Sequence, residues 1–93
     1  MAQILIVEDE DNIATALEFL MTRDGHDHRR LALGAGALDA IRAAPPDLVL
    51  LDIMLPDVSG YQIVQELRAD PGLRDVRVLM MTARGSVIDR KST

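Results

Sequence analysis

Short apolar runs that alternate with segments of helical periodicity most constrain what this 93-residue chain can fold into. Residues 4–7, 48–51 and 76–81 are runs rich in Ile, Leu, Val and Met. Such continuous hydrophobicity is typical of strands that are buried on both faces of a parallel sheet. Residues 28–33 form a weaker and more polar run, which fits a strand at the edge of the sheet.

Between these runs, apolar residues recur at helical spacing. The predicted helices are residues 12–24, a segment after Gly34-Ala35-Gly36 that carries Leu38 and Ile41, and a segment from about Ser59 that carries Ile63, Val64 and Leu67. Asp11 or Asn12 is expected to cap the first helix. Pro45-Pro46 and Pro71-Gly72 end the second and third helices, because proline cannot continue a helix. We expect residues 84–93 to begin a fourth helix.

The order of these elements predicts an α/β fold, because strands that alternate with helices form a parallel sheet with right-handed crossovers. The length allows a single domain, residues 1–93. Hydrophobic residues make up 48% of the chain, which excludes a disordered protein. The absence of cysteine excludes disulfides and thiolate metal sites.

Charge and hydropathy limit the partners and the compartment. The net charge is −5 and no Lys/Arg-rich run is present, so we expect no direct nucleic-acid binding by this domain. No apolar run is long enough to cross a bilayer, and the N-terminus lacks the basic start of a signal peptide. These observations predict a cytoplasmic protein with no membrane partner.

Acidic residues stand where predicted strands end. Glu8 and Asp9 follow the first strand, Asp52 closes the third, and Thr82 follows the fourth. Sites in open α/β sheets form beyond the carboxyl ends of the strands. If the first and third strands are neighbours, the three carboxylates therefore meet in one crevice.

Clustered carboxylates repel one another unless a cation neutralises them, and oxygen ligands alone favour Mg²⁺. A carboxylate beside Mg²⁺ can act as a nucleophile toward a phosphoryl group, with the Thr82 hydroxyl near the transferred oxygens. The alternative interpretation is that Glu8, Asp9 and Asp11 only favour a helix N-terminus electrostatically. That alternative leaves the position of Asp52 unexplained.

Three stretches resemble the response-regulator receiver domains of two-component signalling, the CheY-like superfamily. They are ILIVEDEDN (4–12), DLVLLDIMLPDVSG (47–60) and VLMMTA (78–83). The resemblance implies a flavodoxin-like doubly wound parallel sheet with strand order 2-1-3-4. It also implies that the family's strand 5 and helix 5 are missing, because the chain stops at Thr93.

The resemblance also assigns roles to particular residues. Glu8 and Asp9 would be the acidic pair that binds Mg²⁺. Asp52 would be the phosphoacceptor and a metal ligand, and Met54 would bind the metal through its backbone carbonyl. Thr82 would be the switch hydroxyl, with the backbone amide of Ala83 beside it. The phosphoryl donor would be a phosphohistidine on a sensor histidine kinase or a phosphotransfer protein. Such a domain catalyses its own phosphorylation but is not usually called an enzyme.

Two alternatives remain open. Lys91 is the only lysine and is a poor candidate for the family's phosphate-binding lysine, so a degenerate receiver that only binds proteins is possible. A haloacid-dehalogenase-type phosphatase would need a second aspartate two residues after Asp52, where this chain has Met54. Without a fifth strand and helix, we expect the fourth strand's edge and the sheet face beside the first helix to favour a homodimer or swapped dimer.

Overall fold

A computed structural model of the chain describes residues 2–81 and 87–88. Its elements are β1 (Gln3–Val7), α1 (Asp11–Arg23), β2 (Asp27–Leu31), α2 (Ala37–Ala43), β3 (Leu48–Asp52), α3 (Gly60–Ala69), the 3-10 turn η1 (Pro71–Leu73), β4 (Arg77–Met81) and β5 (Val87–Ile88). Among the described residues, no helix is long and apolar enough to cross a membrane.

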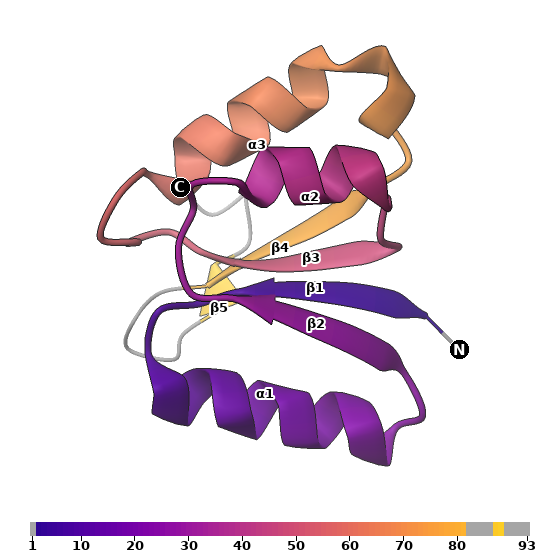
Figure 1. Cartoon of the computed structure of the whole chain (residues 1–93), viewed down its shortest axis with the longest axis vertical. Coiled ribbons are helices and arrows are strands. Elements are labelled where there is room, and N and C mark those ends of the chain that lie inside the picture. Colours follow the sequence, from indigo (N-terminus) through magenta and orange to yellow (C-terminus); the bar gives the residue numbers. More distant parts are fainter. Residues whose placement is uncertain (1, 82–86, 89–93) are drawn as a thin grey trace.

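The strands form one sheet in the order β2-β1-β3-β4-β5. The first four are parallel, which confirms the predicted order 2-1-3-4 and the doubly wound architecture. Figure 1 shows α1 on one side of the sheet and α2 with α3 on the other. Val7 pairs with Leu51 and Asp52 pairs with Met81, so β1, β3 and β4 all end at the same edge.

The two faces of the sheet carry separate clusters of buried side chains, as the alternation of side chains along a strand requires. Leu5, Val7, Val49 and Leu51 pack against the α2 and α3 side, where Ile41 and Leu67 are fully buried. Ile4, Ile6, Leu50 and Met81 pack on the α1 side, together with Leu17 and Met21 of α1. The continuous apolar runs are thus explained, because β1 and β3 are covered on both faces.

Two residues of the predicted fourth helix form a strand instead, and the rest of that segment, residues 84–86 and 89–93, lies outside the described residues. Residues 84–93 were expected to begin a fourth helix, whereas Val87–Ile88 forms β5, antiparallel to β4. β-branched residues favour extended structure, and the edge of β4 offers unpaired backbone groups. The β4 edge is therefore paired at Met80 and Met81, and the expectation of a wholly uncovered edge was wrong there.

Two predicted boundaries also differ. β2 ends at Leu31 instead of residue 33, because Leu31 pairs with Val7, the last residue of β1. The N-cap of α1 is Glu10, whose side chain makes no capping hydrogen bond. Asp11 and Asn12, one of which was expected to cap α1, both lie inside its first turn, so that prediction was wrong.

Candidate metal centre

Three carboxylates meet at the edge of the sheet where β1 and β3 end. One side-chain oxygen from each of Glu8, Asp9 and Asp52 lies within 4.8 Å of the others. Glu8 and Asp52 are completely buried, whereas Asp9 is exposed. The structure thus brings together the three acids that the sequence placed at strand ends, and it leaves one of them open to solvent.

Each buried carboxylate has one oxygen that is hydrogen-bonded and one that is not. The Glu10 backbone amide donates to Glu8 Oε2 over 3.0 Å, and the Met54 amide donates to Asp52 Oδ1 over 3.1 Å. Glu8 Oε1 and Asp52 Oδ2 are buried and have no hydrogen-bond partner in the part of the chain that the structure describes. Buried polar atoms are rarely left unpaired, because desolvation without a new bond is costly. Two unpaired carboxylate oxygens beside a third acid fit the ligand set of a hard divalent cation.

The electrostatics of the cluster are visible in the pKa of Glu8. Burial raises that pKa from its ordinary 4.5 to about 7, and the charges of Asp52 and Asp9 push it in the same direction. The hydrogen bond from the Glu10 amide opposes this rise. Without a cation, the folded protein therefore holds a proton on Glu8 at pH values where a free glutamate has lost it.

Gly60 allows the loop after β3 to pack closely against the end of that strand. A Cβ atom on Gly60 would lie 2.5 Å from the Asp52 carbonyl oxygen, so only glycine allows α3 to begin this close to the strand end. The Gly60 amide donates to the Ile53 carbonyl over 3.0 Å. Ser59 then caps α3, because its hydroxyl accepts a hydrogen bond from the Tyr61 amide.

Asp57 has a role that the sequence did not indicate. Its Oδ1 accepts a hydrogen bond from the Gly34 amide over 3.0 Å, and its Oδ2 accepts one from the Ala35 amide over 2.7 Å. These amide bonds lower the pKa of Asp57 below its usual 3.8. The carboxylate thereby ties the loop after β3 to the loop before α2. The only available sign was Gly34-Ala35-Gly36, which predicted a turn but no partner.

The remaining predicted site residues are placed only in part. The Met54 amide donates a hydrogen bond to Asp52, and Met54 as a whole is 69% exposed. The role of the Met54 carbonyl stays a prediction. Thr82, Ala83 and Lys91 lie outside the described residues.

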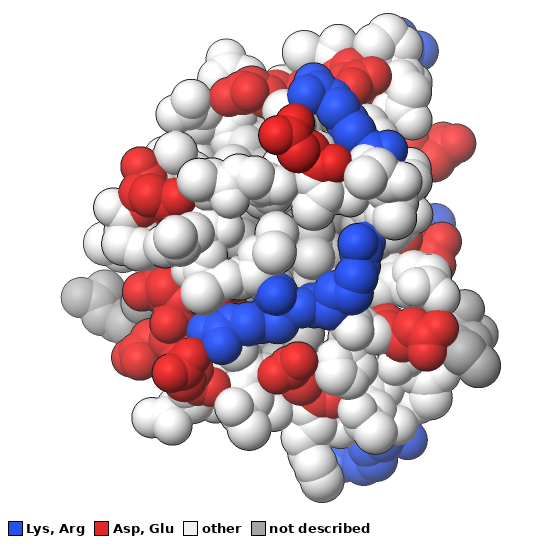
Figure 2. Space-filling model, in the orientation of Figure 1, with Lys and Arg blue, Asp and Glu red and all other residues white. Residues whose placement is uncertain are grey.

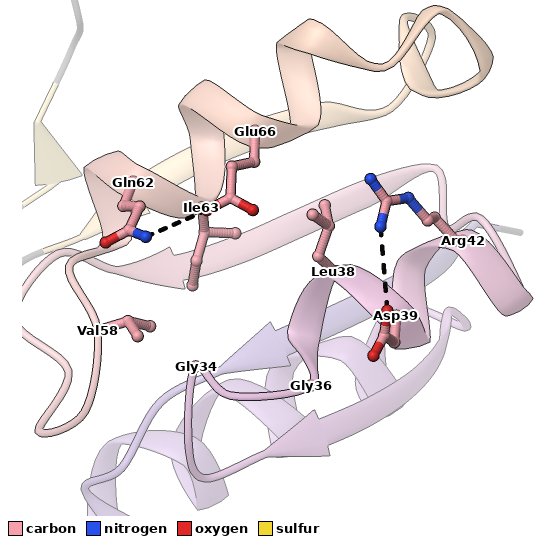
Figure 3. A pocket seen from close by; sticks show the side chains of 9 residues that line it. All are labelled: Gly34, Gly36, Leu38, Asp39, Arg42, Val58, Gln62, Ile63 and Glu66. Atoms are coloured by element: carbon pink, nitrogen blue, oxygen red, sulfur yellow. Dashed lines mark hydrogen bonds and ion pairs between the residues drawn. The ribbon is translucent and has the colours of Figure 1, made fainter.

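A separate hollow of about 260 Å³ lies between α2 and α3 (Figure 3). Its wall includes Leu38, Ile63 and the ion pair between Arg42 and Asp39, which are 3.9 Å apart. None of the three clustered carboxylates lines this hollow. The candidate site is therefore the acidic cluster at the edge of the sheet.

Fold and cluster together define a doubly wound α/β domain with an acidic centre at the carboxyl ends of its strands. The family model of the response regulator receiver domain matches residues 4–93, and the chain belongs to this family.

Similar proteins agree with this assignment. The sensory transduction protein RegX3 of Mycobacterium bovis is 42% identical over 90 residues, which cover 97% of this chain and 38% of RegX3. This chain therefore spans less than half the length of that relative.

Two solved structures share the fold. The N-terminal domain of a response regulator receiver protein from Methanoculleus marisnigri is 34% identical, with a TM-score of 0.84 over 98% of this chain and 72% of that one. The response regulator TrrA of Thermotoga maritima, solved in complex with Mg²⁺-BeF, is 32% identical, with a TM-score of 0.81 over 89% of this chain and 70% of that one.

Proposed function

We propose that this domain accepts a phosphoryl group on Asp52 with the help of Mg²⁺. In this proposal, Glu8, Asp9, Asp52 and the Met54 carbonyl hold the ion. The observation that carries the proposal is that buried Asp52 and Glu8, which cluster with Asp9, each have one carboxylate oxygen with no hydrogen-bond partner among the described residues. The complex of TrrA with Mg²⁺-BeF is consistent with it.

The chemistry is a phosphoryl transfer between two side chains. A carboxylate oxygen of Asp52 attacks the phosphorus of a phosphohistidine, so an O–P bond forms and the P–N bond breaks, with its electron pair returning to the imidazole nitrogen. Mg²⁺, when bound, neutralises the charge that accumulates between the acids and the phosphoryl oxygens. The Met54 amide keeps Asp52 oriented through Oδ1. The hydroxyl of Thr82 and the amide of Ala83 stay predictions for binding the transferred group.

The partners follow from the same proposal. The donor is a sensor histidine kinase or a phosphotransfer protein, and the reaction takes place in the cytoplasm. The acceptor of the phosphoryl group is Asp52 itself. The domain therefore acts as a switch and not as an enzyme that turns over external substrates. The proposal includes no direct contact with nucleic acid or membrane.

The decisive test is incubation with acetyl phosphate and Mg²⁺, followed by intact-mass spectrometry. The wild-type protein should gain the mass of one phosphoryl group, and Asp52→Asn should gain none. Asp75→Asn is the matched control, because Asp75 is an exposed aspartate outside the cluster. If the wild type binds Mg²⁺ but never gains the mass, the chain is the degenerate receiver that only binds other proteins.

The proposal also includes self-association through the α1 side of the sheet. Leu79 of β4 lies on this side and is 38% exposed, and Phe19 of α1 is 66% exposed. Exposed apolar area of this kind favours contact with a second copy. Light scattering should report a dimer for the wild type and a monomer for Leu79→Glu, and a monomeric wild type at high concentration would contradict the idea.

A further inference from the structure

Arg30 of β2 reaches across the end of β1 and holds the backbone of the acidic loop. Its Nε and one terminal nitrogen both donate to the Glu8 carbonyl oxygen, over 3.0 and 2.7 Å. The other terminal nitrogen donates to Asp11 Oδ1 over 2.9 Å. One guanidinium thus joins the first residue of the loop after β1 to the first turn of α1.

The position of Arg30 follows from the register of the sheet. Arg30 pairs with Ile6, and its side chain points to the α1 side, as that of Ile6 does. Only 22% of the Arg30 side chain is exposed, whereas 86% of the Asp11 side chain is. Figure 2 shows a band of basic atoms that crosses the surface between α1 and α2 and ends at a group of acidic atoms. A half-buried arginine with three donated bonds is held far more firmly than a solvated one.

Inside the loop that Arg30 holds, one hydrogen bond runs from the Glu10 amide to the Glu8 carboxylate. Glu10, the N-cap of α1, makes no side-chain capping bond. The Glu8 amide donates to the Leu31 carbonyl over 3.0 Å, so β2 grips both backbone groups of Glu8. The neighbouring strand therefore holds the Glu8 backbone, while the Glu10 amide holds the Glu8 carboxylate through Oε2.

We infer that Arg30 is a positioning residue of the metal centre, which acts through the backbone of Glu8 to orient the acids for a divalent cation. This inference rests on the proposed function. Residues that orient metal ligands change affinity by about tenfold or more when they are replaced. Arg30 does not touch the transferred phosphoryl group and is not itself a ligand.

The charge of Arg30 makes the inference testable by the direction in which Mg²⁺ affinity changes when Arg30 is replaced. A positive charge beside the cluster repels Mg²⁺, so removing it should tighten binding if electrostatics alone matter. Removing a positioning contact should weaken binding, because the acids then need to be ordered by the ion itself. The two effects are opposite, and the measured direction of the change decides between them.

The experiment measures Mg²⁺ affinity by isothermal titration calorimetry on the whole chain, at a temperature where circular dichroism shows every variant folded. Arg30→Gln should weaken binding by about tenfold. Arg30→Lys keeps the charge but loses the planar fork, and it should weaken binding by several-fold. Arg29→Gln is the matched control, because Arg29 is the adjacent arginine of β2 and bonds instead to the Ala44 carbonyl. It should bind as the wild type does or slightly more tightly.

The outcomes separate this inference from the proposed function. If Arg30→Gln binds Mg²⁺ as tightly as the wild type, or more tightly, the positioning role is wrong while the proposed function stands. If Arg30→Gln does not fold, Arg30→Lys decides the matter by the same criterion. If the wild type binds no Mg²⁺ and gains no phosphoryl mass, the proposed function itself fails.

Discussion

The two loops that carry the acidic centre are held in different ways. The loop after β3, residues 53–59, is constrained by its own residues, because Gly60 packs on the Asp52 backbone and Ser59 caps α3. The loop after β1, residues 8–10, leads into a helix with no side-chain cap and is held by Arg30 from β2.

This contrast separates two kinds of constraint. Close backbone packing is insensitive to solvent conditions, but it tolerates no added atoms. Hydrogen bonds from one side chain, here Arg30, are lost by a single substitution elsewhere in the sequence. The buried acid whose backbone Arg30 holds, Glu8, also responds to pH and to cations. We expect substitutions that add atoms to disrupt the loop after β3. We expect changes of charge or pH to disrupt the loop after β1. The four predictions below test this contrast.

Replacing Gly60 by alanine should have the largest effect. The new Cβ would lie 2.5 Å from the Asp52 carbonyl oxygen and 2.9 Å from the Ile53 Cα. Backbone atoms cannot rotate away, so the free energy of unfolding, measured with urea, should fall by about 3 kcal/mol or more. Gly72→Ala is the control, because only the Asp70 carboxylate lies near, at 3.4 Å. Equal stability of the two variants would contradict the steric account.

Replacing Glu8 by glutamine should remove a pH dependence of the metal-free protein. The folded-state pKa of Glu8 is raised from 4.5 to about 7, so between these values only the folded state holds the proton. The stability that Glu8 contributes is complete below pH 4.5 and is lost as pH rises to about 7. The loss is roughly 3 kcal/mol in the free energy of unfolding.

Urea denaturation across this pH window measures the effect. Glu8→Gln cannot ionise, so its unfolding free energy should lack this downward slope. Glu10→Gln is the control, since Glu10 is the exposed neighbour in the same loop. A slope that persists in Glu8→Gln would assign the titration to another group.

Replacing Ser59 by alanine should have a moderate effect. The variant loses the hydrogen bond from the Tyr61 amide and should be about 1 kcal/mol less stable to urea. Glu10→Ala removes the N-cap side chain of α1, which makes no capping bond, and should change stability by less than about 0.5 kcal/mol. If Glu10→Ala costs as much as Ser59→Ala, the two helix starts are not supported differently.

Replacing Asp57 by alanine should have the smallest effect on global stability and a clear local one. The amides of Gly34 and Ala35 lose their acceptor, so their hydrogen exchange, followed by NMR, should become faster. The pKa of Asp57 is lowered by these amides, so its contribution is present above the usual 3.8 and is lost as pH falls through the lower folded value. Asp75→Ala should leave both exchange rates unchanged.

Sequence reasoning predicted most of the fold because its evidence is local. The apolar runs and their spacing gave β1, β3, β4 and three helices, with boundaries that differ by one or two residues at several ends. It failed at residues 87–88, where a two-residue strand pairs with β4, because so short a segment has no periodicity of its own. It also misplaced the cap of α1, since several adjacent acids were equally plausible there.

By itself, the sequence determined that acids would stand at strand ends and that a helix would begin near Ser59. Only the tertiary structure decided that Glu8 and Asp52 are fully buried, each with one oxygen that finds no partner among residues 2–81 and 87–88. It also decided that Arg30 grips the Glu8 carbonyl. The physical reason is that local order depends on neighbours in the chain, whereas burial and long-range hydrogen bonds depend on which distant segments pack together.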